Sequence, residues 1–236
     1  MSSKFVRFFN LVILNFLLVF SISACGSSAD NSYQARIING TKGLSAITAK
    51  FNDEVFFEEL SYTEGTSFFK VPALASLLRI GSPDLALPLL EAEIKAEKDQ
   101  YRTFVVLKGT DDGPRFRIVD FTEEYKRPFS GEVSLQIINA STLDESVDVY
   151  VVLPDTRSIS SLDPAVKKVA VGKKSNAFSL SEGTYIIIYT ESETKSALWK
   201  SREITLKSGT AYTHLLFDGA QKQDKFTGGL FEDRTF

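Results

Sequence analysis

Pairs of neighbouring carboxylates are the first feature of this chain that could do chemistry. Asp53-Glu54 and Asp111-Asp112-Gly113 offer oxygen ligands of the kind that Ca²⁺ takes. The same residue types also form turns, because an Asp side chain accepts hydrogen bonds from nearby backbone amides and Gly supplies the bend. Glu58-Glu59 and Glu123-Glu124 could supply a glycosidase acid pair, although carboxylates are also common at the solvated ends of strands. We favour the turn and surface interpretations and predict no metal site.

The chain contains one histidine, His214, and one cysteine, Cys25. Because Cys25 is expected to carry lipid, no free cysteine remains for Cys–His catalysis, and Cys/His zinc sites need several such ligands. A Ser-His-Asp triad would have to form around His214, and no Gly-x-Ser-x-Gly turn is present to expose a serine. We therefore expect His214 to be a strand residue that faces solvent or a neighbouring domain. We also expect the chain to use no cofactor and not to be an enzyme; the remaining catalytic alternative is a hydrolase built across two domains.

Aromatic side chains are better candidates for binding. Phe56-Phe57 and Phe68-Phe69 each place neighbouring rings on opposite faces of an extended segment, since side chains alternate along a strand. One ring of each pair is expected in a core or between domains, and the other could contact a ligand or partner. Trp199, the one tryptophan, is either buried or an exposed stacking platform. The candidate contact residues are Phe57, Phe69 and Trp199.

Residues 1–24 are typical of a secretory signal peptide. Lys4 and Arg7 precede an apolar run at 8–20, and small residues follow it, which is the order found in such leaders. The run is shorter than the ~20 residues that a membrane-spanning helix needs.

The end of this leader, Ile22-Ser23-Ala24-Cys25, resembles a bacterial lipobox. The resemblance implies cleavage before Cys25, attachment of diacylglycerol to its sulfur and acylation of the new N-terminus; the alternative is an ordinary leader with a chance cysteine nearby. Two or more acyl chains suffice for stable anchoring, at ~0.8 kcal/mol per buried methylene. Gly26 is not the Asp that commonly retains lipoproteins in the inner membrane of Gram-negative enterobacteria, which favours the outer membrane. The predicted flexible tether is 25–33, because Gly26 to Ser32 within it are small and polar.

Composition indicates a folded and mildly acidic protein. Removing Lys4 and Arg7 changes the 27 basic and 30 acidic residues to 25 and 30, a net charge of −5. This charge disfavours nucleic acid as a partner, because phosphate neutralisation dominates that kind of binding. A hydrophobic content of 43% with 19 Phe supports a packed core. With Cys25 lipidated, no disulfide can form.

The chain repeats itself. Residues 35–40 recur at 135–140 with an offset of 100, and 103–109 resemble 213–219 with an offset of 110. The ten extra residues fit the loop at 153–164. The predicted organisation is a domain at 34–125, a linker at 126–130, a homologous domain at 131–220 and a C-terminal tail at 221–236.

Both units are predicted to be all-β sandwiches, because short alternating runs are separated by Gly, Pro, Asn and Asp turns. The expected strands lie near 34–39, 46–51, 54–60, 66–71, 75–80, 90–95 and 101–108, and then near 132–138, 146–151, 183–189, 201–206 and 212–217. Residues 85–97 could pass for a helix, but the repeat favours a strand at 91–96.

Four segments carry a resemblance to a known family. Ile137-Ile138-Asn139, together with 147–151, 181–185 and 206–213, is similar to uncharacterised bacterial surface domains with transthyretin-like or immunoglobulin-like sandwich folds. These domains are usually paired in tandem and often lie on lipoproteins. In the first unit Val71-Pro72-Ala73-Leu74 replaces the Gly-Thr-Tyr turn, so membership there depends on the repeat. The resemblance implies binding modules and supplies no catalytic residue.

The expected function is that of a non-enzymatic cell-envelope lipoprotein that acts as a protein-interaction or structural module. Its expected location is the outer membrane, with a lipid anchor in the bilayer and an envelope protein as partner. Edge strands recruit partners by strand addition, and residues 75–80 or 228–236 are the candidate edges. The alternative is a glycan-binding or small-ligand-binding module at the cell surface.

Overall fold

The computed structural model describes residues 31–73, 76–83, 85, 88–109, 114–142, 146–219 and 224–236. The predicted signal peptide, Cys25 and most of the predicted tether lie outside these residues, as does Asp111-Asp112-Gly113. Ser32–Phe236 form one unit. In the described residues no helix is long and apolar enough to cross a membrane.

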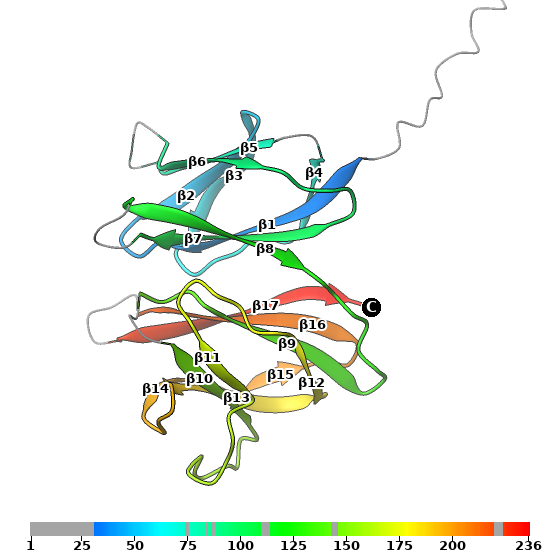
Figure 1. Ribbon diagram of the computed structural model, residues 1–236, viewed down its shortest axis with the longest axis vertical. Helices are drawn as coiled ribbons and strands as arrows, with labels where there is room; N and C mark the ends of the chain where they lie inside the picture. The colour runs from blue at the N-terminus through cyan, green and yellow to red at the C-terminus, as the bar shows by residue number, and fades with distance from the viewer. Residues whose placement is uncertain are drawn as a thin grey trace, which may run out of the picture. The chain divides into compact units, whose positions relative to one another are not determined.

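The all-β prediction is confirmed, since the described residues form 17 strands and no helix (Figure 1). The first eight strands are β1 (Ser32–Gly40), β2 (Ala46–Phe51), β3 (Glu54–Ser61), β4 (Phe69–Pro72), β5 (Ser76–Gly81), β6 (Leu90–Ile94), β7 (Tyr101–Lys108) and β8 (Phe116–Glu123). The others are β9 (Glu132–Asn139), β10 (Val147–Val152), β11 (Val166–Val169), β12 (Phe178–Ser181), β13 (Gly183–Glu191), β14 (Ala197–Lys200), β15 (Ile204–Leu206), β16 (Thr210–Asp218) and β17 (Phe226–Thr235).

These strands form two sandwiches. Sheet A has the order β4-β1-β7-β8 and sheet B the order β3-β2-β5-β6; together they are called the N lobe. Sheet C has the order β12-β9-β16-β17, and sheet D has the order β11-β10-β13-β14 with β15 also paired to β13; together they are called the C lobe. Within sheets A and C, β1 pairs with β7 and β9 pairs with β16 in parallel.

The two-residue period of the strands builds a core in each lobe. Tyr33, Ala35 and Ile37 of β1 are fully buried and share one cluster with Phe51 and Leu78 of sheet B. Because successive side chains point to opposite faces of a sheet, these alternate residues all turn toward sheet B. The C-lobe core is built in the same way from Val133, Leu135, Ile137, Val149, Ile187 and Tyr189, among others.

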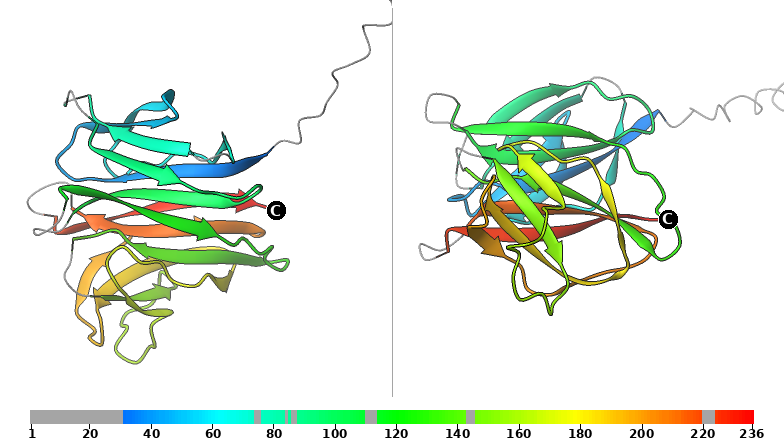
Figure 2. Two further views of the ribbon diagram at one scale, coloured as in Figure 1. Left: turned by 45° about the horizontal axis from the view of Figure 1, so that its top comes forward. Right: turned by 60° about the horizontal axis from the view of Figure 1, so that its bottom comes forward.

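Sheets A and C are buried on both faces because the lobes pack against each other through them. Ile38 and Val105, which alternate with the N-lobe core residues, share a third cluster with Ile138, Leu215 and Phe217 of the C lobe. Their strands are therefore buried along nearly their whole length, as expected for sheets covered on both sides. Figure 2 shows the resulting stack of layers.

Polar pairs cross this contact between the lobes. Arg36 of β1 forms a buried ion pair with Asp233 of β17, and Thr213 donates to the Asp233 carboxylate at 2.6 Å. At the offsets of 100 and 110, Gln136 and Glu123 occupy the corresponding positions, and the Gln136 amide donates to Glu123 at 3.1 Å. Equivalent positions of the repeat therefore form both polar pairs between the lobes: an ion pair in one case, and an amide bonded to a carboxylate in the other.

The Asn of each repeated Ile-Ile-Asn motif hydrogen-bonds to the backbone two residues after it and to a neighbouring strand. The amide of Asn39 donates to the Leu60 carbonyl at 2.9 Å, and its oxygen accepts from the Thr41 backbone at 2.9 Å. Asn139 makes the matching contacts with the Val169 carbonyl at 3.1 Å and the backbone of Ser141 at 3.2 Å. Both Asn side chains are buried, so their hydrogen bonds replace water that cannot reach them.

The structure differs from the predicted strands in several places, and three short strands of the C lobe, β11, β12 and β14, were not predicted. Residues 75–80, predicted as a free edge, include β5, which lies between β2 and β6 and therefore has no free edge. Residues 221–236, predicted as a tail, include β17, which pairs with β16 along its whole length and forms one end of sheet C. The equivalent β8 was not predicted. Gly228 and Gly229 lower the strand propensity of β17, which conceals it in the sequence. At 91–96, in contrast, the strand prediction is matched by β6.

Candidate functional site

Two end strands of the N lobe carry two of the predicted contact residues. β3 ends sheet B and β4 ends sheet A, and within the described ranges no strand pairs with their outer edges. Asn52 and Asp53 have positive φ angles of 50° and 69° and form the two-residue turn that leads from β2 into β3. Phe57 lies on β3 and Phe69 on β4.

Phenylalanine rings from both strands meet at this edge. Phe56 and Phe69 stack with ring centroids 4.9 Å apart, and the centroids of Phe57 and Phe69 are 6.3 Å apart. Buried Phe51 supports them from the core, with its centroid 5.3 Å from that of Phe56. The three outer rings are half-buried, and Val55 beside them is 45% exposed. Val55, Phe56, Phe57 and Phe69 are called the aromatic edge.

Carboxylates surround the aromatic edge. Glu54, Glu58 and Glu59 of β3 are exposed, and none of them forms an ion pair with another described residue. Phe69 pairs with Ala35, which is only three residues from the start of β1. The aromatic edge is thus an apolar centre with an acidic border, close to the point where the folded unit begins.

Trp199, the third predicted contact residue, belongs to the C-lobe core. It lies on β14 and is half-buried, with its centroid 6.0 Å from that of Tyr189 and 5.6 Å from that of His214. Gly228 of β17 lies directly against it, since a Cβ there would be 2.4 Å from the indole ring. The structure therefore brings Phe57 and Phe69 together and places Trp199 in the other lobe.

His214 is buried in the C lobe, whereas the sequence analysis expected it to face solvent or a neighbouring domain. It is 2% exposed, and its Nδ1 lies 2.8 Å from the Tyr189 hydroxyl. Burial lowers the pKa of His214 to about 3 and raises that of Tyr189. The imidazole is therefore neutral at pH 7 and shares one hydrogen bond with the phenol. Its burial follows from the alternation of β16, on which Tyr212 and Leu216 face the same core.

Of the carboxylates considered as catalytic or metal ligands, Asp53 and Glu123 bind other side chains of this chain, whereas Glu54, Glu58 and Glu59 are exposed. Asp53 forms an ion pair with Arg79. The Glu123 side chain is 1% exposed and accepts from Gln136 at 3.1 Å and from Lys174 Nζ at 2.7 Å. Over the described ranges, no three His, Cys, Asp or Glu side chains gather into a group that could hold a metal ion.

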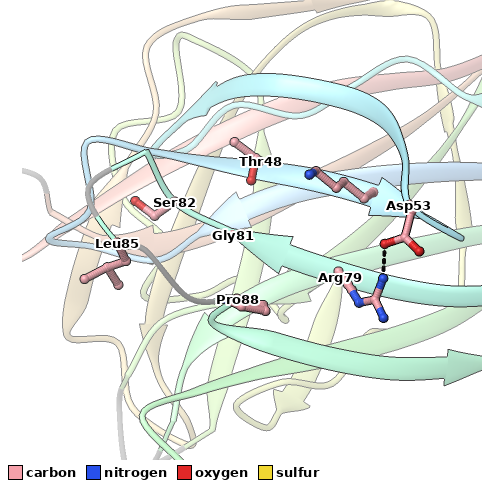
Figure 3. A pocket seen from close by; sticks show the side chains of 8 residues that line it. Thr48, Asp53, Arg79, Gly81, Ser82, Leu85 and Pro88 are labelled. Carbon is pink, nitrogen blue, oxygen red and sulfur yellow. Dashed lines mark hydrogen bonds and ion pairs between the residues drawn. The ribbon is translucent and has the colours of Figure 1, made fainter.

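A hollow of about 220 Å³ lies on the outer face of sheet B (Figure 3). Arg79 in this hollow is held by Asp53 and by Glu91, the latter at 2.7 Å, so its charge is already balanced. A Cβ on Gly81 would be 2.6 Å from the Thr48 hydroxyl, and the missing side chain keeps the hollow open. The lining residues are Thr48, Lys50, Asp53, Arg79, Gly81, Ser82, Leu85 and Pro88.

The outer face of sheet D is covered by the ten-residue insertion. Ile159, from the loop at 153–164, packs on an apolar cluster formed by Tyr150, Val152, Ile186 and Ile188. These four side chains point away from the C-lobe core, and the loop shields them from water. The insertion therefore serves to cover an apolar face. The outer face of sheet B in the N lobe is polar and needs no such cover.

A groove of about 640 Å³ lies beside the connection between the lobes, and it is called the connector groove. It is lined by three stretches: the end of β8 with the segment after it, two residues of β9, and the segment that leads into β12 with the first residues of β12. The lining residues are Thr122, Glu124, Lys126, Arg127, Pro128, Phe129, Ser134, Gln136, Lys174, Ser175, Asn176, Ala177, Phe178 and Ser179.

The connector groove contains polar side chains that the fold does not use. Lys126 and Arg127 are exposed and form no ion pair within the part of the chain that the structure describes. Over the same part, the side chains of Asn176 and Ser179 make no hydrogen bond. Phe129 is 80% exposed. Residues 126–130 are the predicted linker, and Phe129 was not among the predicted contact residues; an aromatic side chain close to two cations in a linker was the available signal.

Comparisons with known proteins give one match. A family model described as "Domain of unknown function (DUF4397)" matches residues 33–150, which is 118 of the 236 residues. The matched region begins in β1 and ends in β10, so it covers the N lobe, the connection, β9 and part of β10. No curated protein matches the chain.

Proposed function

We propose a function for this chain on the premise that it belongs to the DUF4397 family, whose description states no activity. The chain is a non-enzymatic lipoprotein of the cell envelope, cleaved after residue 24, lipidated on Cys25 and carrying a tandem pair of homologous sandwich domains. It acts as a protein-interaction module, and its partner binds at the aromatic edge.

The observation that carries this proposal is the composition of the aromatic edge. A partner segment that adds a strand to a sheet gains affinity from main-chain hydrogen bonds and specificity from alternate side chains in pockets. Among the described strands β3 has an unpaired outer edge, and the half-buried rings of Phe57 and Phe69 offer an apolar surface beside it. Exposed apolar edges invite unwanted pairing, and proteins usually avoid them, so a binding role gives this edge a reason to persist.

The charges on β3 indicate the kind of partner. Glu54, Glu58 and Glu59 are exposed and form no ion pair with described residues. A basic segment would place its cations against these carboxylates and its apolar side chains against Val55 and Phe57. Such complementarity raises the rate of association and excludes acidic competitors.

The predicted anchor limits where this partner can be. The seven residues from Cys25 to Ser32 reach at most about 25 Å when fully extended. The N lobe would then stay near the membrane surface, and β4 pairs with the first residues of β1. The proposed partner is therefore a protein of the same membrane or of the space directly beside it.

Site-specific photo-crosslinking in intact cells tests the proposal. A photoreactive residue at Val55, which is 45% exposed, should form an adduct with one envelope protein, whereas the same residue at Leu153, 56% exposed on the C lobe, should not. Glu58→Lys with Glu59→Lys should reduce the Val55 adduct at least fivefold, and Lys98→Glu, a charge reversal elsewhere on the N lobe, should leave it unchanged. Equal adducts from positions 55 and 153, or none from either, would count against this function.

A further inference from the structure

The connector groove differs from the aromatic edge in its chemistry, and we propose that it binds an acidic oligosaccharide. In this arrangement a sugar carboxylate lies at Lys126 and Arg127, and a sugar ring lies on Phe129. The inference does not depend on the aromatic edge. It gives a place and a ligand class to the glycan-binding alternative.

Polar groups without partners are the first reason. A sugar presents several hydroxyls, each of which must exchange water for a protein group when it binds, since an unpaired buried polar group is costly. Hydroxyl and amide side chains can both donate and accept. Ser134, Asn176 and Ser179 line the groove and make no side-chain hydrogen bond within the described ranges. Their capacity is available to a ligand rich in hydroxyls.

The position of Phe129 is the second reason. Its 80% exposure is the highest of any large hydrophobic side chain in the described part of the chain. It lies on the segment after β8, and half-buried Phe178 lines the groove from the segment at β12. An aromatic face accommodates the apolar C–H face of a sugar ring, and the polar side chains around it accommodate the hydroxyls at the ring edge.

The unpaired cations of the groove favour an acidic sugar over a neutral one. Of the three cations in the groove, Lys174 is already bonded to Glu123 at 2.7 Å and to the Thr122 carbonyl at 2.7 Å. Lys126 and Arg127 remain, against one lining carboxylate, Glu124. The planar fork of Arg matches a carboxylate with two parallel hydrogen bonds. A protein with an excess of acidic residues therefore keeps a cationic site at this groove.

Backbone pairing disfavours the addition of a peptide strand at β9, on one side of the groove. A peptide that adds a strand needs unpaired N–H and C=O groups along the edge it joins. β9 beside the groove is already paired, since the Ile137 backbone donates to the Ser175 hydroxyl at 3.0 Å and accepts from the Ser175 backbone at 2.8 Å. The Asn139 backbone likewise donates to the Lys173 carbonyl at 3.1 Å. At β9, side chains rather than backbone groups are therefore left to bind a ligand. β8 and β12, which also line the groove, end their sheets, so a peptide is included among the probes of the test.

Titration calorimetry with the full mature chain tests the proposal. The probes are a tetrasaccharide of galacturonate, the same tetrasaccharide with its carboxyls reduced to alcohols, and an acidic peptide of alternating Glu and Tyr. We expect the galacturonate probe to bind at least tenfold more tightly than the other two. Phe129→Ala and the double change Lys126→Ala with Arg127→Ala should each weaken that binding at least tenfold. Leu153→Ala and Lys98→Ala, matched changes at exposed positions outside the groove, should leave it unchanged.

Other results would overturn the proposal. Equal binding of the reduced tetrasaccharide would refute the role of charge, and tighter binding of the peptide would refute the ligand class. Binding that survives both groove changes would place the ligand elsewhere, and failure of every probe to bind at millimolar concentration would reject a uronate site. The groove variants should leave the Val55 adduct unchanged, so failure of this inference is separable from failure of the proposed function.

Discussion

At the scale of the residue, Tyr189 and His214 show how the C-lobe core holds polar groups without charge. The pKa of His214 is about 3 in the folded chain and about 6.5 in an unfolded one. A pKa lowered by folding contributes stability that is complete above the unfolded value and is lost as the pH falls toward the folded value. The loss should therefore run from about pH 6.5 to about pH 3 and reach at most about 5 kcal/mol.

Urea unfolding at a series of pH values between 7.5 and 4, followed by the fluorescence of Trp199, measures this loss. His214→Gln removes the titrating group, so its stability should fall less with acidification than that of the wild-type chain. The carboxylates common to both chains cancel in the comparison. Parallel pH profiles for the two chains would contradict this prediction, because they would show that unfolding does not change the protonation of His214.

Cys25 carries the second prediction at this scale. Cells grown with labelled palmitate should incorporate the label into the wild-type chain and not into Cys25→Ala, because the thioether requires the sulfur. Cys25→Ala should also move from the membrane fraction to the soluble fraction, since acyl chains supply the anchoring free energy. Equal labelling of both chains would refute lipidation at this residue.

At the scale of the element, the buried Asn of each Ile-Ile-Asn motif should contribute similarly in both lobes. Asn39→Ala leaves the Leu60 carbonyl and the Thr41 backbone without their partner, and Asn139→Ala does the same at Val169 and Ser141. Each change should lower the free energy of unfolding by about 2–4 kcal/mol, as expected when buried polar groups lose partners.

Asn176→Ala is the matched control for these changes, because Asn176 is exposed and makes no side-chain hydrogen bond with described residues. Its effect should stay within about 0.5 kcal/mol. A loss at position 139 several times smaller than at position 39 would mean that the repeated motif does not have the same role in the two lobes.

Periodicity in the sequence predicts where strands lie better than it predicts which other parts of the chain pack against them. Alternation along 32–40 and 132–139 is strong enough to locate β1 and β9. The burial of Ile38 and Ile138 on the opposite face is also visible, as an unbroken apolar pair, but only the packing of the two lobes explains it. β17 was hidden because Gly228 has no side chain to show a pattern, and the reason for that glycine is Trp199, which is 29 positions away.

The same limit applies to the candidate sites: the sequence identifies residue types, and the fold decides which residues meet. Phe57 and Phe69 were identified from their residue type, yet their contact depends on β3 and β4 being end strands of different sheets. Phe129 was missed because a linker has no periodicity from which to judge exposure. The insertion at 153–164 was located by the repeat, whereas its covering role depends on the apolar outer face of sheet D.

At the scale of the whole molecule, the buried pair of Arg36 and Asp233 joins the two lobes. Burial raises the pKa of Asp233, although Arg36 and Thr213 both act to lower it. Arg36→Leu should cost about 3–5 kcal/mol, because it leaves a carboxylate buried without its cation. Adding Asp233→Leu should restore most of that loss, since an apolar pair of similar volume needs no solvation.

Urea unfolding of the wild type, the single variant and the double variant measures these differences. Arg79→Leu, which breaks the surface ion pairs with Asp53 and Glu91, is the matched control and should lower the free energy of unfolding far less than Arg36→Leu does. A double variant as unstable as Arg36→Leu would contradict the account of the contact between the lobes, because it would show that the ion pair itself, and not the unpaired charge, determines the loss.

We propose that the chain works at a membrane surface by binding a protein partner. The most direct test compares Val55 photo-adducts in intact cells for the anchored chain and for Cys25→Ala, at equal amounts of folded protein. We predict an adduct with one envelope protein from the anchored chain and at least a fivefold lower yield from Cys25→Ala. The same adduct in equal yield from both chains would contradict the role of the anchor, and the absence of any adduct from the anchored chain would contradict the binding claim.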